Sequence, residues 1–297
     1  MNNVLIIAIT AGLMGMIGWG LADFFAKMTI DKVGDMATLA WAHLFGLGLI
    51  VLLVLLKLVS GHDIVLPGNF SEFFSLVFFG ALQAFVYFFV YRAFGKGQVA
   101  ILNPIFSSYS GIVVVLSVAV FGEVIRLPQL LVVGLIFFGV LAISLEQESL
   151  ALRKFKFANL PGVADIITAA ALAAVWTILW SQFVSGKDWL VYAAIMYFWM
   201  SVVIFCISKF QKINLKVADK SLWKYFFFIG LAEVAAYVGV SIGYSLTSHT
   251  SIVAVISGAF SVPTILLARV FLRDKLDQVQ TLGAALIIAG IVLIMLV

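Results

Sequence analysis

The sequence has little charge. Asp, Glu, Lys and Arg make up 11% of its 297 residues, whereas an ordinary soluble domain has about 25%. Hydrophobic residues reach 64%, above the usual share of about 45–50%. This composition excludes a soluble globular domain and a disordered chain. A single cysteine, Cys206, excludes an internal disulfide.

Motifs for two common kinds of catalytic site are missing. The chain contains no Gly-x-x-x-x-Gly-Lys-Ser/Thr phosphate loop and no His-Glu-x-x-His zinc motif. His43 stands alone in an apolar run, without a second metal ligand nearby in sequence. We therefore expect no enzyme, no resident metal and no cofactor. The net charge of +4 is small and does not indicate nucleic-acid binding.

Long apolar runs fill the chain. A membrane-spanning helix needs about 20 mostly apolar residues, and the sequence contains ten such runs. They predict an all-α integral membrane protein of ten transmembrane helices whose surroundings are the lipid bilayer. The predicted spans are 4–26, 36–56, 72–91, 98–121, 128–145, 162–184, 188–208, 224–245, 250–271 and 278–297.

Basic residues alternate between the connections. Cytoplasmic loops of membrane proteins carry the excess of Lys and Arg, and all but three of the 18 basic residues fall in the connections after the odd-numbered spans. The exceptions are Lys57, Arg126 and Lys187. The bias predicts that both termini lie outside the cytoplasm. The same bias agrees with an even number of spans. We expect a multi-pass protein of the cell membrane.

The second half of the chain repeats the first. With a shift of 151 residues the end of span 4 and all of span 5 match the end of span 9 and span 10 without gaps. The matches include Glu123/Asp274, Gln129/Gln280, Gly139/Gly290 and Ile143/Ile294. We predict a first five-helix repeat at 1–146, a cytoplasmic linker at 147–161 and a second repeat at 162–297. Because five is odd, the repeats must enter the membrane in opposite senses, an architecture typical of secondary transporters.

The ends of the two halves resemble a known family. Each half has an acidic residue after its fourth span, followed by a fifth span of the form Gln-x-x-x-x-Gly/Ala-x-x-x-x-Gly. The segments are Glu123…Gln129…Gly134…Gly139 and Asp274…Gln280…Ala285…Gly290. They are similar to tandem EamA domains of the drug/metabolite transporter superfamily. The resemblance implies ten spans, a central cavity and export of amino acids or other small metabolites.

Two polar stripes are the strongest candidates for a substrate site. Polar groups inside the bilayer are costly and therefore point to function. Residues four apart share a helix face, and two matching helices carry such stripes: Gln83, Tyr87 and Tyr91 in span 3, and Glu233, Tyr237 and Ser241 in span 8. We expect these stripes to line a central pocket, with Glu233 as the proton-coupling group. The alternative is a set of interhelical hydrogen bonds that only fix packing, worth about 0.6–2 kcal/mol each.

Other candidates surround these stripes. Trp19, Asp23 and Lys27 share one face of span 1, so an Asp23–Lys27 ion pair is a candidate gate, or else an interfacial pair. Trp176 and Trp180 lie one turn apart and are candidates for the cavity wall, or else are lipid-facing or packing tryptophans.

Pro104 and Pro263 interrupt spans 4 and 9 at comparable depth and are hinge candidates. Each should leave the carbonyl four residues earlier without its helical partner. Small-x-x-x-small spacings in spans 1 and 10 favour close packing within the chain first and a homodimer second.

Three functions fit these features unequally. The first is a secondary transporter, of the exporter type, whose small-molecule substrates are amino acids above all. A nucleotide-sugar or sugar-phosphate exchanger would need Lys or Arg clamps in the membrane, and Arg92, Lys96 and Arg269 lie near span ends. A receptor or scaffold without transport would need neither a deep acid nor matched polar stripes.

Overall fold

The described structure is entirely helical. The computed structural model describes residues 3–97, 99–143, 161–267, 270–271, 278–294 and 296. No strand occurs within these ranges. The predicted linker 147–161 falls outside them except for Pro161.

The helices follow the predicted apolar runs. In the first half they are α1 (Asn3–Val33), α2 (Asp35–Val59), α3 (Phe70–Lys96), α4 (Val99–Ser107), α5 (Tyr109–Ala119) and α6 (Leu127–Ile143). In the second half they are α8 (Val163–Val184), α9 (Trp189–Phe210), the short 3₁₀ helix η2 (Lys220–Leu222), α10 (Trp223–Leu246), α11 (Thr250–Gly258), α12 (Ser261–Leu267) and α13 (Gln278–Ile294). Seven helical stretches of the described residues are long and apolar enough to cross a membrane, and three shorter apolar helices accompany them. The chain is therefore a multi-pass membrane protein, while the count of ten spans stays a prediction.

Local sequence sets where several helices begin. Asn69 precedes α3, and its side-chain oxygen accepts a hydrogen bond from the Glu72 amide. Asp188 caps α9 in the same way through the Val191 amide. Such caps satisfy amides that have no partner within the helix. Between α1 and α2 the turn is made by Gly34 alone, at a φ of 87° that glycine adopts without steric cost.

The fourth span of each half is divided in two. Ser108 separates α4 from α5, and Ala259 and Phe260 separate α11 from α12. Pro104 lies in α4 before the first break, and Pro263 lies in α12 after the second. The carbonyl of Ala259, predicted to lose its partner, instead accepts a hydrogen bond of 3.0 Å from the Val262 amide. The helical donor is absent as predicted, since residue 263 is a proline, and the turn at Ala259 supplies another donor.

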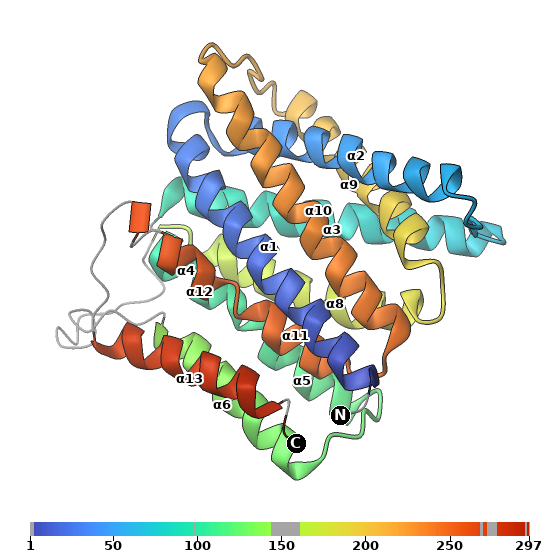
Figure 1. Ribbon diagram of the computed structural model, residues 1–297. Coiled ribbons are helices and arrows are strands. Elements are labelled where there is room, and N and C mark those ends of the chain that lie inside the picture. Colours follow the sequence, from blue (N-terminus) through green and yellow to red (C-terminus); the bar gives the residue numbers. More distant parts are fainter. Residues whose placement is uncertain are drawn as a thin grey trace.

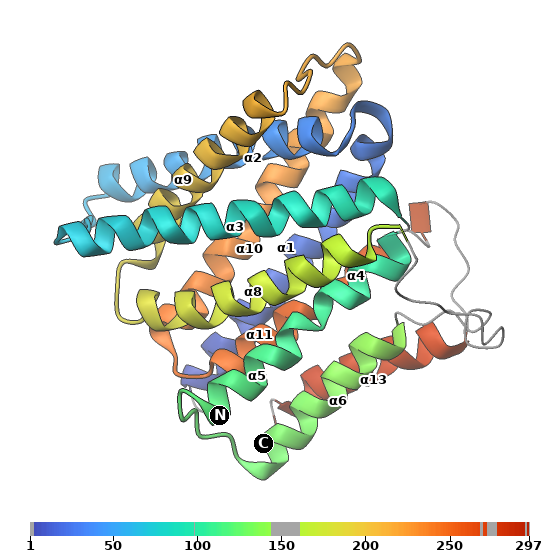
Figure 2. The ribbon, with the colours of Figure 1, turned by 180° about the vertical axis from the view of Figure 1, so that it is seen from behind.

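Helices of one half pack on helices of the other. In Figures 1 and 2, α1 lies beside α10, and α3 lies beside α8. Other large contacts between the halves join α3 with α9, α2 with α10, α1 with α11, α2 with α9, α5 with α11, and α6 with α13. A two-fold relation between the repeats would exchange the two helices of some of these contacts, such as α6 with α13. It would turn others into one another, such as α1–α10 into α8–α3. This pattern supports the predicted duplication and places the centre of the molecule between α1, α3, α8 and α10.

Candidate substrate site

The two predicted polar stripes face each other. Gln83 Nε2 of α3 donates a hydrogen bond of 2.7 Å to the Tyr237 hydroxyl of α10. Two turns further along α3 and one turn earlier on α10, the Tyr91 hydroxyl donates to Glu233 Oε1 at 3.3 Å. All four side chains are buried. The structure therefore joins residues 150 or so positions apart into one polar cluster between the two halves of the chain.

Glu233 is the centre of this cluster. Its exposed fraction is 0%. Besides Tyr91, the Tyr197 hydroxyl of α9 donates to Glu233 Oε2 at 3.1 Å. His43 Nε2 of α2 lies 3.6 Å from the same oxygen, and His43 Nδ1 is 3.0 Å from the Leu39 carbonyl. The carboxyl group thus meets tyrosines from both halves and a histidine from the first.

Aromatic rings enclose the cluster. Tyr237 is their common contact: the ring centroids of Trp19, Trp176 and Tyr197 lie 6.0, 6.0 and 5.6 Å from its own. Tyr87 packs 6.3 Å from it. Rings in this number supply faces that attract apolar or cationic groups.

The tryptophan pair of span 6 lies at one side of the polar cluster. Trp176 and Trp180 stack with centroids 5.5 Å apart, and both are buried within the protein. Trp176 Nε1 donates to the Phe79 carbonyl of α3 at 3.2 Å. This placement is not lipid-facing; the cavity wall stays a prediction beside the alternative of packing within the bundle.

The predicted pair of Asp23 with Lys27 is wrong. Lys27 Nζ contacts Asp31 at 2.7 Å, and both side chains are partly exposed. Asp23 is buried and accepts a hydrogen bond of 3.0 Å from Asn103 Nδ2 of α4. The two side chains separate because Asp23 points into the bundle, while one turn later Lys27 reaches the surface. Asp23 thereby joins the buried polar groups, and whether either residue gates a cavity stays a prediction.

Small residues make room for the cluster. On α2, a Cβ atom at Gly46 would overlap the Tyr197 hydroxyl, so only glycine there lets Tyr197 reach Glu233.

Ser241 is fully buried, and its hydroxyl has no partner among the described residues. It lies in a Gly239-x-Ser241-x-Gly243 sequence, a spacing shared with hydrolase nucleophile elbows. Here the segment lies within α10, and its two glycines pack on α1. The glycines therefore serve helix packing, and the segment is not a nucleophile elbow.

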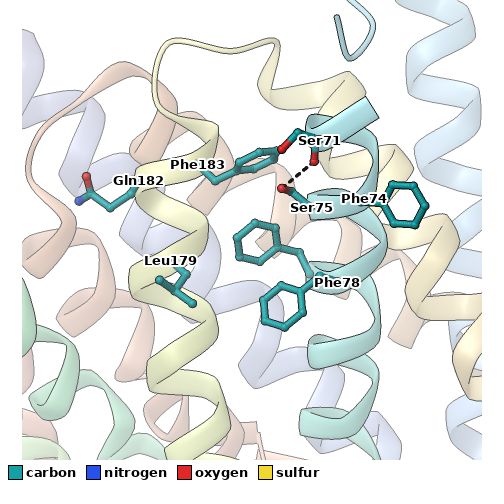
Figure 3. Close-up of a pocket in the computed structure, with 8 residues that line it drawn as sticks. Ser71, Phe74, Ser75, Phe78, Leu179, Gln182 and Phe183 are labelled. Atoms are coloured by element: carbon teal, nitrogen blue, oxygen red, sulfur yellow. Dashed lines mark hydrogen bonds between the residues drawn. The ribbon is translucent and has the colours of Figure 1, made fainter. Parts of the chain in front are cut away.

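A cleft opens beside the cluster. It lies between α3 and α8, encloses about 630 Å³, and is lined by Ser71, Phe74, Ser75, Phe78, Phe79, Leu179, Gln182 and Phe183. Figure 3 shows Ser71, Ser75, Phe78, Leu179 and Phe183 between the two helices, whereas Phe74 and Gln182 point away from the gap. Phe79 separates the cleft from the tryptophan pair, since its ring packs 5.3 Å from Trp180.

Ion pairs join the two halves at both ends of the bundle. At one end Lys57 contacts Asp188 at 2.7 Å and Lys187 contacts Glu72 at 2.6 Å. At the other end Lys96 contacts Asp165 at 2.5 Å. Burial favours a higher pKa for Asp188, but hydrogen bonds from Lys57 and the amides of Val65 and Val191 hold that pKa below its usual value.

Glu123 makes a further connection between the halves. Its carboxylate accepts hydrogen bonds from the Ser251 amide and hydroxyl, the latter at 2.8 Å, at the start of α11. Burial raises the pKa of Glu123, and the bonds from Ser251 partly oppose that rise. This residue therefore ties the loop before α6 to the second half.

No metal centre accompanies these groups. Across the residues that the structure describes, no cluster of three or more His, Cys, Asp or Glu side chains could hold a metal ion. Sequence reasoning missed Tyr197 and gave His43 no role. Nothing in their local sequence distinguishes them, because only the packing of α2 and α9 on α10 brings them to Glu233.

Comparison with known proteins identifies the family. The EamA-like transporter family matches residues 6–145 and again residues 160–296. The chain belongs to this family. The two matches cover nearly the whole length and show tandem EamA regions, as the sequence resemblance indicated.

Two individual relatives extend the comparison. An uncharacterized protein of Methanocaldococcus jannaschii is 29% identical over 145 residues, which are 47% of this chain and 98% of that protein. That relative is thus about as long as one EamA region. A solved structure described as "Crystal structure of protein" superposes with a TM-score of 0.74, covering 99% of this chain and 98% of its own, at 17% identity. At that identity the likeness concerns the fold alone.

Proposed function

We propose that this EamA-family chain is a secondary transporter of the exporter type that moves small metabolites, amino acids above all, across the cell membrane. The substrate binds between the two repeats at the cluster around Glu233, and the site opens alternately to either side. Transport is coupled to a proton that binds Glu233. Both termini lie on the non-cytoplasmic side.

The observation that carries the proposal is the environment of Glu233. A carboxyl group in a membrane protein is costly and is retained where it serves a pathway or a relay. Glu233 is fully buried and contacts Tyr91 of the first half and Tyr197 of the second. A movement of one repeat against the other would change the contacts of Glu233 with Tyr91 and His43 of the first half, and proton binding would therefore depend on the conformation.

Two further features suit such movement. The ion pairs at both ends join residues of different halves, so one set can break while the other holds. The breaks at Ser108 and at Ala259 divide α4 from α5 and α11 from α12. They serve as the hinges that we predicted at Pro104 and Pro263.

A sugar-phosphate exchanger is less well supported. Its anionic substrate would need free cationic groups near the centre. Arg92 and Lys96 instead lie against Asp165 at the end of the bundle, at 3.7 and 2.5 Å. Arg269, the other basic candidate, lies outside the described residues.

A counterflow assay tests the proposal. The purified full chain, reconstituted in liposomes, is loaded with unlabelled amino acids, purine derivatives or sugar phosphates and presented with the labelled compound. We expect transient accumulation of at least one amino acid, increased by a pH gradient. Accumulation of sugar phosphates alone, or of no compound above protein-free liposomes, would contradict the proposed function.

A further inference from the structure

Several buried polar atoms near Glu233 have no partner within the described part of the chain. Gln83 donates its amide N–H to Tyr237, and Asn103 donates its own to Asp23. Both side-chain oxygens, Gln83 Oε1 and Asn103 Oδ1, are buried without a hydrogen bond. A buried polar group left without a partner costs about 1–3 kcal/mol. Two free acceptors are thus held inside the bundle at a cost to stability.

Asp23 and Glu233 add two carboxyl groups to these acceptors. Helices α1 and α10 are antiparallel: Gly18 packs on Ala232 and Ala236, whereas Gly15, which comes earlier in α1, packs on Val240, which comes later in α10. Trp19 packs on Tyr237, so one turn further along, Asp23 lies at the level of Glu233. Both carboxyl groups are buried inside the bundle.

Among the residues that the structure describes, no Lys or Arg side chain pairs with Asp23 or Glu233. In the described ranges, the side-chain partners of Asp23 and Glu233 are an amide, two tyrosine hydroxyls and a histidine. Lys27, Lys57 and Lys96 pair with acids elsewhere. The centre therefore combines two carboxyl groups and two unpartnered amide oxygens with aromatic faces, and the indole N–H groups of Trp19 and Trp180 are buried there without a partner among the described residues as well.

We infer that this site recognises its substrate through a protonated amine and does not require a carboxylate on the substrate. The inference rests on the proposed transport function and names its substrate class: primary amines with a compact apolar body, among which amino acids are one case. An ammonium group has three N–H donors and no acceptor, which matches the free oxygens of Gln83 and Asn103 and the two carboxyl groups. The rings of Tyr237, Tyr87 and Trp176 present faces that attract a cation.

Binding of matched ligands to the detergent-solubilised full chain tests the inference by calorimetry. Each set has one body and three forms: phenylalanine, 2-phenylethylamine and 3-phenylpropionate; leucine, 3-methylbutylamine and 4-methylpentanoate; alanine, ethylamine and propionate. We expect that in at least one set the amine binds no more weakly than the amino acid. The acid without nitrogen should bind at least about tenfold more weakly, as loss of a charged hydrogen bond implies.

Two results would overturn the inference: an acid that binds as well as its amine, or failure of all three amines to bind. If counterflow of some metabolite persists in either case, the transport function stands and the amine requirement alone fails. If counterflow is also lacking, the proposed function fails as well.

Variants give a second readout. Asp23→Asn and Glu233→Gln should each weaken amine binding at least about tenfold. Asp219→Asn is the matched control, since Asp219 lies before η2 and bonds only locally to Ser221; amine affinity should be unchanged. Because the ligand series uses the unaltered chain, the inference is tested even if a variant fails to fold. Equal amine affinity in folded Asp23→Asn and the unaltered chain would contradict the role of Asp23.

Discussion

In the Glu233→Gln variant, we expect transport to lose its response to a pH gradient. The amide has the size of the carboxyl group. Its oxygen can accept from one of the two tyrosines, Tyr91 or Tyr197, and its NH2 group can donate to the hydroxyl of the other, but it cannot bind or release a proton. The increase in substrate uptake that a pH gradient produces should fall by at least about tenfold, corresponding to about 1.4 kcal/mol. Uptake into proteoliposomes with and without the gradient measures this change.

Glu123→Gln is the control for this experiment. Glu123 is also a partly buried glutamate, but it contacts Ser251 at the start of α11, away from the cluster. Its replacement should leave the response to the pH gradient intact. A Glu233→Gln variant that is folded and still responds fully to the gradient would remove Glu233 from the coupling mechanism.

In the Gly46→Ala variant, we expect loss of both stability and transport. The added methyl group would overlap the Tyr197 hydroxyl between α2 and α9, which must move away from Glu233. Overpacking of this kind costs about 1–3 kcal/mol. A lower temperature of thermal unfolding, together with weaker uptake, is the expected result.

Gly48→Ala tests whether the effect is local. Gly48 lies two residues later on the same helix, and nothing stands within 4 Å of the position of its Cβ. Alanine there should be neutral or stabilise the helix by up to about 1 kcal/mol, because glycine is the poorer helix former. Equal unfolding temperatures for the two variants would show that α2 and α9 are less closely packed around Tyr197 than the structure indicates.

Much of the helical framework follows from the sequence, for physical reasons. A helix in lipid must be long and apolar, so the runs that became α2, α3, α9 and α10 are visible without any knowledge of their neighbours. The i, i+4 spacing of Glu233 and Tyr237 likewise fixes their shared face on α10. The facing stripe on α3 could be predicted because the repeat matched Gln83 with Glu233.

Other parts of the site depend on how helices rotate and pack. Tyr197 and His43 reach Glu233 only through the contacts of α9 and α2 with α10. The partner of Asp23 was mispredicted for the same reason. Spacing within α1 favours Lys27, whereas burial turns Asp23 toward Asn103 on a helix 80 residues away. Sequence spacing describes one helix at a time and does not determine which neighbour a buried side chain meets.

Accessibility of position 241 tests the central claim of an alternately exposed centre most directly. Ser241 is buried on the Glu233 face of α10, and the chain has one native cysteine, Cys206. Ser241→Cys in a Cys206→Ser background therefore provides a single thiol, and Cys206→Ser alone is the blank. Membrane-impermeant thiol reagents added from either side should both react, with substrate changing the two rates in opposite directions. Reaction from neither side, or from one side only whatever the substrate, would contradict alternating access at this site.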